Sequence, residues 1–488
     1  MKMTPIKKIL SAFAVTVVLA ALPAAAADFS NYVALGDSLT AGYTGGGLEQ
    51  FFQEHSYPAT IARQAGSPVF EMPLVSEPGL PPLLMLAHLV PSPVIVPSSA
   101  VPGQPINATY PAPYNDLGVP GATLYDMLFT TGNIQNLLAG NLDNVMHDLI
   151  LRDGQHTALE QAIGLNPTFV SVWIGNNDIL GAAVMGTPVE GVTMTPVANF
   201  QQMYQTALGA LATNTNADIM VVNIPDVAAI PFVTTIKPFI VLPDGSHVPL
   251  IGSNGPLPED AYVTLNASAL LAQGIGIPTA LGGTGQPLPE DIQIVGSDVI
   301  PGVVLRPAEV QVIEDRVAAF NQIIQDTADA VGAKVFDVNS FFNDVAAHGY
   351  HPIGALELNA DFLTGGIFGY DGVHPQAIGY GIVATEMIRF INSAFQMDPQ
   401  IPLPNLYELM SGSPNDQPEP VTVQEAQRAF TKEAEDSLLK LFAPKIQQLK
   451  RLEGAGRRIG SVHRAVPVEP RREIRKGMRL APLPNSDR

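Results

Sequence analysis

Short, uniformly apolar runs alternate along the chain with longer stretches in which apolar residues recur at helical spacing. The runs that we expect to be strands lie at 32–35, 168–174, 219–224 and 333–338. Helical periodicity is clear at 200–213 and 307–331. Such runs are typical of strands that are buried on both faces. Their alternation with helices predicts an α/β protein with a central parallel sheet and crossover helices.

A further helix is expected where the alternating region ends. Pro375 suits the first position of a helix, and the apolar residues after it repeat at helical spacing. These residues are Ile378, Ile382, Val383, Met387, Phe390 and Ile391. We therefore expect this helix to pack on the sheet and to hold the preceding loop in place.

Two long segments, at about 74–113 and 232–304, interrupt this alternation. The first is apolar, almost uncharged and rich in proline, so it cannot form a membrane-spanning helix in spite of its length. It is either an ordered surface loop packed on the body, or an apolar wall or lid beside a functional site. The second contains clusters of glycine and proline at 252–256 and 282–285.

The beginning of the chain differs from residues 28–396, which we expect to form one domain. Residues 1–27 combine a basic start, a short apolar stretch and a run of small residues. This order is typical of a secretory signal peptide, and the apolar stretch is too short to span a bilayer. The sequence therefore predicts an exported protein, either periplasmic or extracellular.

The C-terminal part also differs from the domain. Residues 397–420 are rich in proline, asparagine and serine and are expected to be a linker. Within 421–488, a capping box at Thr422–Glu425 predicts a helix that continues to about Phe442. The basic remainder is poor in apolar residues, which favours disorder.

Charge is distributed unevenly over the chain. The net charge is −20, but residues 445–488 carry 12 Lys and Arg against 4 Asp and Glu, which leaves −28 on the rest. An acidic body argues against nucleic acid as a partner. The basic tail is either a solvated end or a site of weak association with anionic surfaces. The chain contains no cysteine, so burial rather than disulfides must stabilise the fold.

Candidate chemistry begins at Ser38, which directly follows the apolar run 32–35. A serine hydroxyl becomes a good nucleophile only when a base removes its proton. His374 is the best candidate base, because Asp371 lies three residues before it and can orient the imidazole. Each piece also has a plainer interpretation: Gly-Asp-Ser is an ordinary turn sequence, and Asp371 with Pro375 suits the start of a helix.

Donors for an oxyanion are expected from two other turns. Glycine lets a backbone N–H approach a substrate closely, as Gly121 in the segment 118–121 would. Asn177, in the segment 175–178, offers a side-chain N–H at the end of an expected strand. That segment can equally be a simple turn, and Asp178 is interpreted as a structural cap.

No metal or other cofactor is expected. His348 and His351 lie near Asp344, but no further cysteine, histidine or paired carboxylate extends the pattern, so we interpret them as surface polar residues. The chain has no His-Glu-x-x-His sequence and no Gly-x-Ser-x-Gly sequence. The second absence disfavours the α/β-hydrolase type of serine esterase.

Taken together, the segments 36–39, 118–121, 175–178 and 371–375 resemble conserved blocks of the SGNH (GDSL) hydrolase family. The resemblance covers roughly residues 28–396, apart from the two insertions. It implies a three-layer α/β/α fold of the flavodoxin-like type and serine-dependent ester hydrolysis without a cofactor. It implies a catalytic triad of Ser38, Asp371 and His374, and an oxyanion hole formed by Ser38, Gly121 and Asn177.

These features predict an exported serine carboxylester hydrolase, of the esterase or lipase type, that works through an acyl-enzyme intermediate. The apolar insertions favour lipid or medium-chain acyl esters as the small-molecule substrate. An esterase that deacetylates a polysaccharide is compatible with the same motifs. A non-catalytic exported binding protein on a hydrolase scaffold is the alternative of another class.

Overall fold

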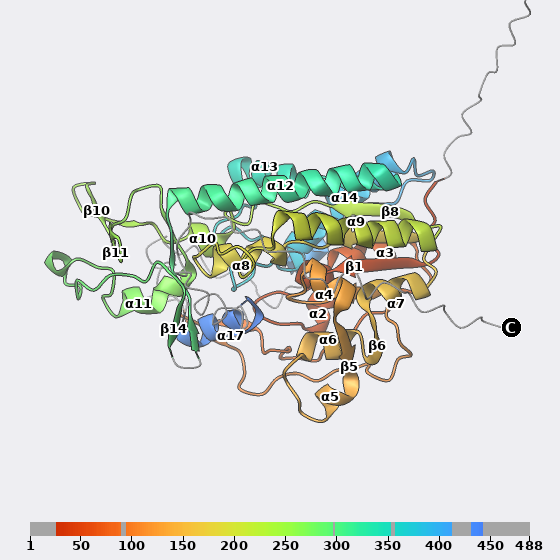
Figure 1. The fold of residues 1–488 in the computed structure, drawn as a ribbon, viewed down its shortest axis with the longest axis horizontal. Helices are drawn as coiled ribbons and strands as arrows, with labels where there is room; N and C mark the ends of the chain where they lie inside the picture. The colour runs from red at the N-terminus through yellow and green to blue at the C-terminus, as the bar shows by residue number, and fades with distance from the viewer. Residues whose placement is uncertain (1–25, 89–93, 296–297, 353–356, 412–430, 443–488) are drawn as a thin grey trace, which may run out of the picture.

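The computed structural model describes residues 26–88, 94–295, 298–352, 357–411 and 431–442 (Figure 1). Its centre is a parallel sheet of five strands in the order β17-β8-β7-β1-β4. The strands, in chain order, are β1 (Tyr32–Gly36), β4 (Asp116–Gly118), β7 (Phe169–Trp173), β8 (Asp218–Val222) and β17 (Lys334–Phe336). Four of them match the apolar runs in the sequence.

The order of the strands places the functional edge of the sheet. The chain adds β4 on one side of β1 and then adds β7, β8 and β17 on the other side. The connection after β1 therefore leads to one side of the sheet, and the later connections lead to the other side. The switch point lies between β1 and β7, as it does between the corresponding strands of the flavodoxin-like fold. Ligands of open α/β sheets bind at this crevice, outside the carboxyl ends of the strands.

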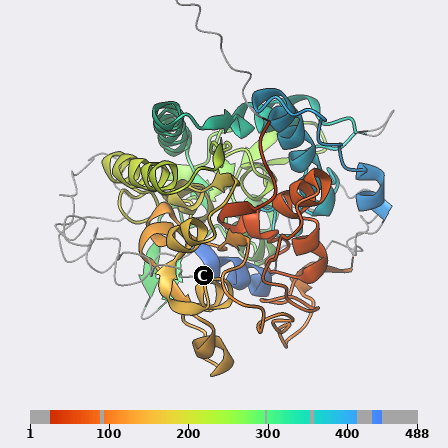
Figure 2. The same cartoon turned by 90° about the vertical axis from the view of Figure 1, so that its right-hand side faces the viewer.

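Helices cover both faces of the sheet, which confirms the expected three-layer α/β/α arrangement. Figure 2 shows α9 and α12 on one side of the sheet and α3 and α14 on the other. Strand β1 explains why both faces are covered, because Val33 and Leu35 point into one core while Tyr32 and Ala34 point into the other. The four helices that form these outer layers are α3 (Tyr57–Ala65), α9 (Val197–Asn214), α12 (Pro307–Val331) and α14 (Ala377–Ala394).

Shorter elements connect and extend these layers. The other described helices are α1 (Ser38–Ala41), α2 (Gln50–Glu54), α4 (Leu124–Phe129), α5 (Ile134–Leu138), α6 (Val145–Ile150), α7 (Ala158–Gly164), α8 (Asn177–Val184), α10 (Pro231–Thr234), η1 (Leu265–Ala267), α11 (Ser268–Ala272), η2 (Thr279–Leu281), α13 (Val338–His348), α15 (Leu406–Ser411) and α17 (Lys432–Phe442). Two-stranded ribbons are formed by β2 (Leu84–His88) with β3 (Val94–Pro97), β5 (Thr131–Asn133) with β6 (Asp153–Thr157), β9 (Phe239–Val241) with β10 (His247–Pro249), β11 (Ile251–Gly252) with β12 (Gly255–Pro256), β13 (Tyr262–Val263) with β16 (Val304–Leu305), and β14 (Gln293–Val295) with β15 (Asp298–Ile300). Among the described helices, none has both the length and the apolar character needed to cross a bilayer.

The last long helix begins two residues later than its proline suggests. Gln376 is the N-cap of α14, and its backbone N–H donates to the carbonyl of Ile367. Pro375 pairs with Phe368 as an isolated bridge. This extended pairing fixes the backbone before Ala377, so the helix starts only there.

The first insertion lies beside the loop that follows α1. Its hairpin of β2 and β3 is anchored there by the backbone N–H of Leu84, which donates to the carbonyl of Gly45 at 2.6 Å. A side chain on Gly47 would meet the carbonyl oxygen of Pro81 at 2.1 Å, so only glycine permits this close approach. The tip of the hairpin, 89–93, lies outside the described residues.

The C-terminal region contributes two described helices. In α15, which falls within the expected linker 397–420, Leu406 and Leu409 are buried against α14. Helix α17 lies apart from α15, beside β3, α8 and η1 (Figure 1). The expected signal peptide, the capping box at Thr422 and the basic tail lie outside the described residues.

Candidate active site

Ser38 is the first residue of α1 and comes directly after the tight turn that ends β1. A side chain on Gly36 would lie 2.0 Å from Thr40 Oγ1 and 2.5 Å from the carbonyl oxygen of Trp173, so glycine is required there. The carboxylate of Asp37 caps the helix by accepting the N–H of Leu39 at 3.0 Å. The turn thereby presents the Ser38 hydroxyl at the carboxyl edge of the sheet.

Ser38, His374 and Asp371 form one hydrogen-bonded chain. Ser38 Oγ lies 2.9 Å from His374 Nε2, although 336 positions separate the two residues. His374 Nδ1 lies 2.9 Å from Asp371 Oδ2. When Nδ1–H donates to the carboxylate, Nε2 is left to accept the serine proton, which is the tautomer that a general base needs.

The Asp371 carboxylate is held by backbone N–H groups as well as by the imidazole. Its Oδ1 accepts from Val373 and His374 at 2.9 Å each, and its Oδ2 accepts from Gly46 at 3.0 Å. Burial by itself would raise the pKa of Asp371, but the charge of His374 and these hydrogen bonds outweigh it and hold that pKa below its usual value. Asp371 is therefore an ionised acceptor that cannot rotate freely.

Gly121 and Asn177 lie together beside this chain of hydrogen bonds. Gly121 has φ of +77°, a conformation that favours glycine. Its backbone N–H donates to no other described residue. Asn177 begins α8, and its Nδ2 donates to the carbonyl of Ala122 at 2.9 Å, which leaves the second amide hydrogen available. The structure thus joins Ser38, His374 and Asp371 directly, and it places Asn177 beside the Gly121 turn.

Asn176, a neighbour within the third motif, links two of the turns. Its Nδ2 donates to Asp37 Oδ2 at 2.8 Å. Burial raises the pKa of Asp37 to about 6, against the opposing effect of this hydrogen bond and of the Leu39 N–H. We did not single out Asn176 from the sequence, because nothing local indicates that its partner lies 139 positions away.

Asp178 lies in α8, but its carboxylate bonds the start of another helix, α4. Its carboxylate accepts the backbone N–H of Leu124, at the start of α4, at 2.8 Å, and the hydroxyl of Thr195 at 2.7 Å. Burial raises the pKa of Asp178 to about 7. Asp178 therefore caps the helix after the Gly121 turn, and so positions that turn relative to α8.

Tyr43 packs against the imidazole, although no motif in the sequence pointed to it. The ring centroids of Tyr43 and His374 are 4.8 Å apart. The Tyr43 hydroxyl donates to the carbonyl of Gly46, whose N–H bonds Asp371. From α14, the hydroxyl of Tyr380 donates to the carbonyl of Tyr43 at 2.5 Å. These contacts tie the last long helix to the triad, as its predicted role requires.

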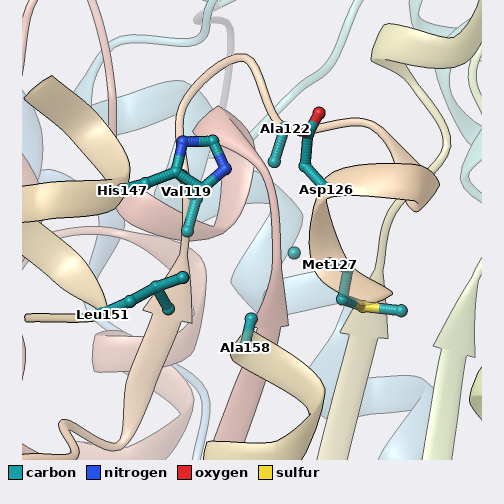
Figure 3. Close-up of a pocket in the computed structure, with 8 residues that line it drawn as sticks. Val119, Ala122, Asp126, Met127, His147, Leu151 and Ala158 are labelled. Atoms are coloured by element: carbon teal, nitrogen blue, oxygen red, sulfur yellow. The ribbon is translucent and has the colours of Figure 1, made fainter. Parts of the chain in front are cut away.

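The three triad residues are buried, whereas Gly121 and Asn177 are partly exposed. Ser38 is 3% exposed and His374 is 1% exposed. The cavity in Figure 3 is lined by Val119, Ala122 and side chains of α4, α6 and α7, so it lies behind the Gly121 turn and does not include Ser38. On the outer side, Leu441 of α17 lies against Gly121.

Nothing in the described part of the chain resembles a metal site. No group of three or more His, Cys, Asp or Glu side chains is suitably placed among these residues. His348 Nδ1 and Asp344 Oδ1 form a pair at 2.9 Å in which both side chains are exposed. This geometry fits the interpretation of these residues as surface polar groups.

The fold is that of an α/β/α hydrolase, with the candidate residues at its switch point. The model of the GDSL-like Lipase/Acylhydrolase family matches residues 32–387, and the chain belongs to this family. Membership supports esterase- or lipase-type hydrolase activity. A search of curated proteins found no match.

Similarity to solved structures is weaker. One similar structure is LAE5, an alpha/beta hydrolase enzyme from the metagenome of Lake Arreo, Spain, at 12% identity and a TM-score of 0.32. The alignment covers 75% of this chain and 96% of that one.

Proposed function

We propose that this chain is a serine carboxylester hydrolase with Ser38 as nucleophile, His374 as general base and Asp371 as its orienting carboxylate. The observation that carries the proposal is the chain of two 2.9 Å contacts from Ser38 Oγ through His374 to Asp371. A serine hydroxyl, an imidazole and a buried carboxylate in this order form a nucleophile with its base and the group that orients the base. Family membership supports the same chemistry.

The proposed reaction proceeds in two halves. His374 Nε2 takes the proton of Ser38, and the serine oxygen attacks the ester carbonyl. The resulting oxyanion accepts the backbone N–H groups of Ser38 and Gly121 and an N–H of Asn177 Nδ2. The imidazolium gives its proton to the departing alkoxide, which leaves an acyl-enzyme. Water then attacks the acyl-enzyme, His374 takes its proton, and the acid is released with Ser38 restored.

Labelling of the serine tests this proposal directly. A small fluorophosphonate should modify one residue, and peptide mapping should place the label on Ser38. The Ser38→Ala variant should take up no label and should lose about 10⁶-fold in kcat, the loss seen when a triad nucleophile is removed. Labelling elsewhere, or hydrolysis that survives in the variant, would remove Ser38 from the mechanism.

Lipid or medium-chain acyl esters are the substrates that the surroundings favour. The apolar hairpin of β2 and β3 lies beside the Gly45–Gly46 turn, and the N–H of Gly46 bonds the triad carboxylate. The proposal therefore takes the first insertion as a wall of the site. p-Nitrophenyl octanoate should be hydrolysed with a higher kcat/KM than the acetate, whereas a maximum at acetate would favour the deacetylating esterase.

The non-catalytic alternative makes a different prediction. A binding protein on a hydrolase scaffold does not need a hydrogen-bonded nucleophile and base with an ionised carboxylate behind them. Failure of Ser38 to react with any fluorophosphonate, in a protein that melts cooperatively, would favour that alternative.

We also propose that the protein is exported and that its basic tail binds anionic surfaces weakly. The composition of residues 1–27 supports the first statement, and the charge of residues 445–488 supports the second. A mature N-terminus near Asp28 would support export. Deletion of residues 457–488 should weaken binding to anionic vesicles at low salt, and unchanged binding would dismiss that role for the tail.

A further inference from the structure

Helix α17 is amphipathic, and its apolar side faces the candidate active site. Lys432 pairs with the exposed Asp436 at 2.8 Å on the outer side, and with Glu435, which is buried, at 3.2 Å. On the inner side, Ala434 is fully buried and Leu439 is 8% exposed. Just before the helix, Thr431 Oγ1 donates to the carbonyl of Ile95 in β3 at 2.7 Å.

The inner side of α17 rests on elements that carry or support the site residues. It contacts α8, which begins with Asn177, and η1. In η1, Leu265 lies against Gly372, between the triad acid and base, since a side chain on Gly372 would be 3.0 Å from Leu265 Cδ1. Leu439 packs with Met185 and Ile292. The helix therefore fills an apolar slot that runs from the end of α8 to the oxyanion turn.

At the oxyanion turn itself, Leu441 packs against Gly121. A methyl group on Gly121 would lie 2.8 Å from Leu441 Cδ1, so the leucine side chain is in van der Waals contact with this glycine. Ser38 is only 3% exposed, so an ester cannot reach its hydroxyl while the chain keeps this arrangement.

We propose that α17 is an internal plug in the acyl-binding slot of this enzyme, and that the slot accepts the apolar acyl chain of a lipid or medium-chain ester once the helix leaves. This inference rests on the proposed function, because it assigns the substrate side of the same site. Met185 and Ile292 would then contact the acyl chain in place of Leu439. Leu441 occupies the position that the first acyl carbons would take.

Variants of the full chain test the plug. Ala434→Arg places a guanidinium where no side-chain space exists, and Leu439→Asp buries a charge, so both should unseat the helix. Neither residue belongs to the catalytic machinery. Asp436→Arg puts the same guanidinium on the exposed side of the same helix and serves as the matched control. Cooperative melting of each variant shows that the body remains folded.

The readouts are the rate at which a small fluorophosphonate labels Ser38 and the kcat/KM for p-nitrophenyl acetate and octanoate. If the wild-type site is open about a tenth of the time and the two variants keep it open, Ala434→Arg and Leu439→Asp should each raise the labelling rate about tenfold. The octanoate-to-acetate ratio should rise as well, and Asp436→Arg should match the wild type.

The outcomes separate the two proposals. If every protein labels at the wild-type rate, the plug is wrong while the serine hydrolase stands. A fall in labelling on unseating would mean that α17 completes the site, which also overturns the plug. If none of the proteins labels or hydrolyses ester, the proposed function fails and the inference fails with it.

Discussion

The loops that carry the triad and the segments that cover it are held by different kinds of contact. Buried carboxylates fix the loops: Asp371 accepts three backbone N–H groups, and Asp37 binds Asn176. The cover is formed by the β2–β3 hairpin and α17, which the bond from Thr431 to Ile95 joins to each other. Helix α17 meets the elements of the site through the apolar side chains of Leu439 and Leu441, and the hairpin meets them through the backbone bond from Leu84 to Gly45. Buried polar networks are costly to break, whereas a peripheral apolar contact opens at lower cost. The difference indicates a preformed site under a removable cover.

After the loss of Ser38 itself, the largest effect should come from the carboxylate that orients the base. In Asp371→Asn, Oδ1 still accepts the N–H groups of Val373 and His374, so the new amide nitrogen faces the imidazole. That nitrogen donates to Nδ1 and imposes the wrong tautomer, so kcat should fall about 10⁴-fold. Asp153→Asn is the control, because Asp153 pairs with His156 at the same three-residue spacing on the surface. A loss of less than tenfold would contradict the role of Asp371.

A smaller loss is expected at the oxyanion donor. Asn177→Ala removes one N–H from the developing charge, and kcat should fall about 10²–10³-fold with little change in KM. Asn214→Ala removes an amide that also donates to a backbone carbonyl, at 2.7 Å on the exposed surface of α9. Its kcat should equal the wild-type value. A near-normal kcat in Asn177→Ala would take this residue out of the hole.

The cover should respond to the loss of one hydrogen bond. Thr431→Val deletes the bond to Ile95, worth about 1 kcal/mol, so labelling of Ser38 should speed up about fivefold. Thr213→Val deletes a bond of equal length, 2.7 Å to the carbonyl of Gly209, on the exposed side of α9. Equal labelling rates in the two variants would show that α17 is not held by Thr431.

The smallest effect concerns stability rather than rate. Burial raises the pKa of Asp116, on β4, to about 8. The folded state therefore keeps a proton that the unfolded chain releases near pH 4, and stability should fall as pH rises between about 4 and 8. Asp116→Asn should remove this slope, so its gain in stability and in Tm over the wild type should grow from pH 4 to pH 8. Exposed Asp143→Asn is the control. A slope that persists in Asp116→Asn would refute the assignment.

Local patterns predicted the fold well where elements are long. Helix α12 matches the expected 307–331, and α9 extends the expected 200–213 by a few residues at its start. Strand β4 was not expected, because its three residues include Asp116 and carry no apolar run. Pro375 pointed to a helix start that the pairing with Phe368 prevents, and that pairing joins segments that no local pattern connects.

The site shows the same limit. The motifs pointed to the three residues that the structure joins by hydrogen bonds and to the neighbouring Gly121 and Asn177, because each motif marks the end of an element. The bond from Asn176 to Asp37, the packing of Tyr43 on His374 and the position of Leu441 on Gly121 depend on contacts between distant parts of the chain. No periodicity or turn signal encodes such contacts.

The hydrogen bond between Asp37 and Asn176 joins the turn after β1 to the turn after β7, so that the two turns form one rigid unit. A displacement of either turn carries the attacking oxygen and the amide of Asn177 along together. Thermal motion at this edge of the sheet then changes how an ester approaches the site. The alignment between the attacking Ser38 oxygen and the Asn177 amide, which stabilises the developing charge, is preserved.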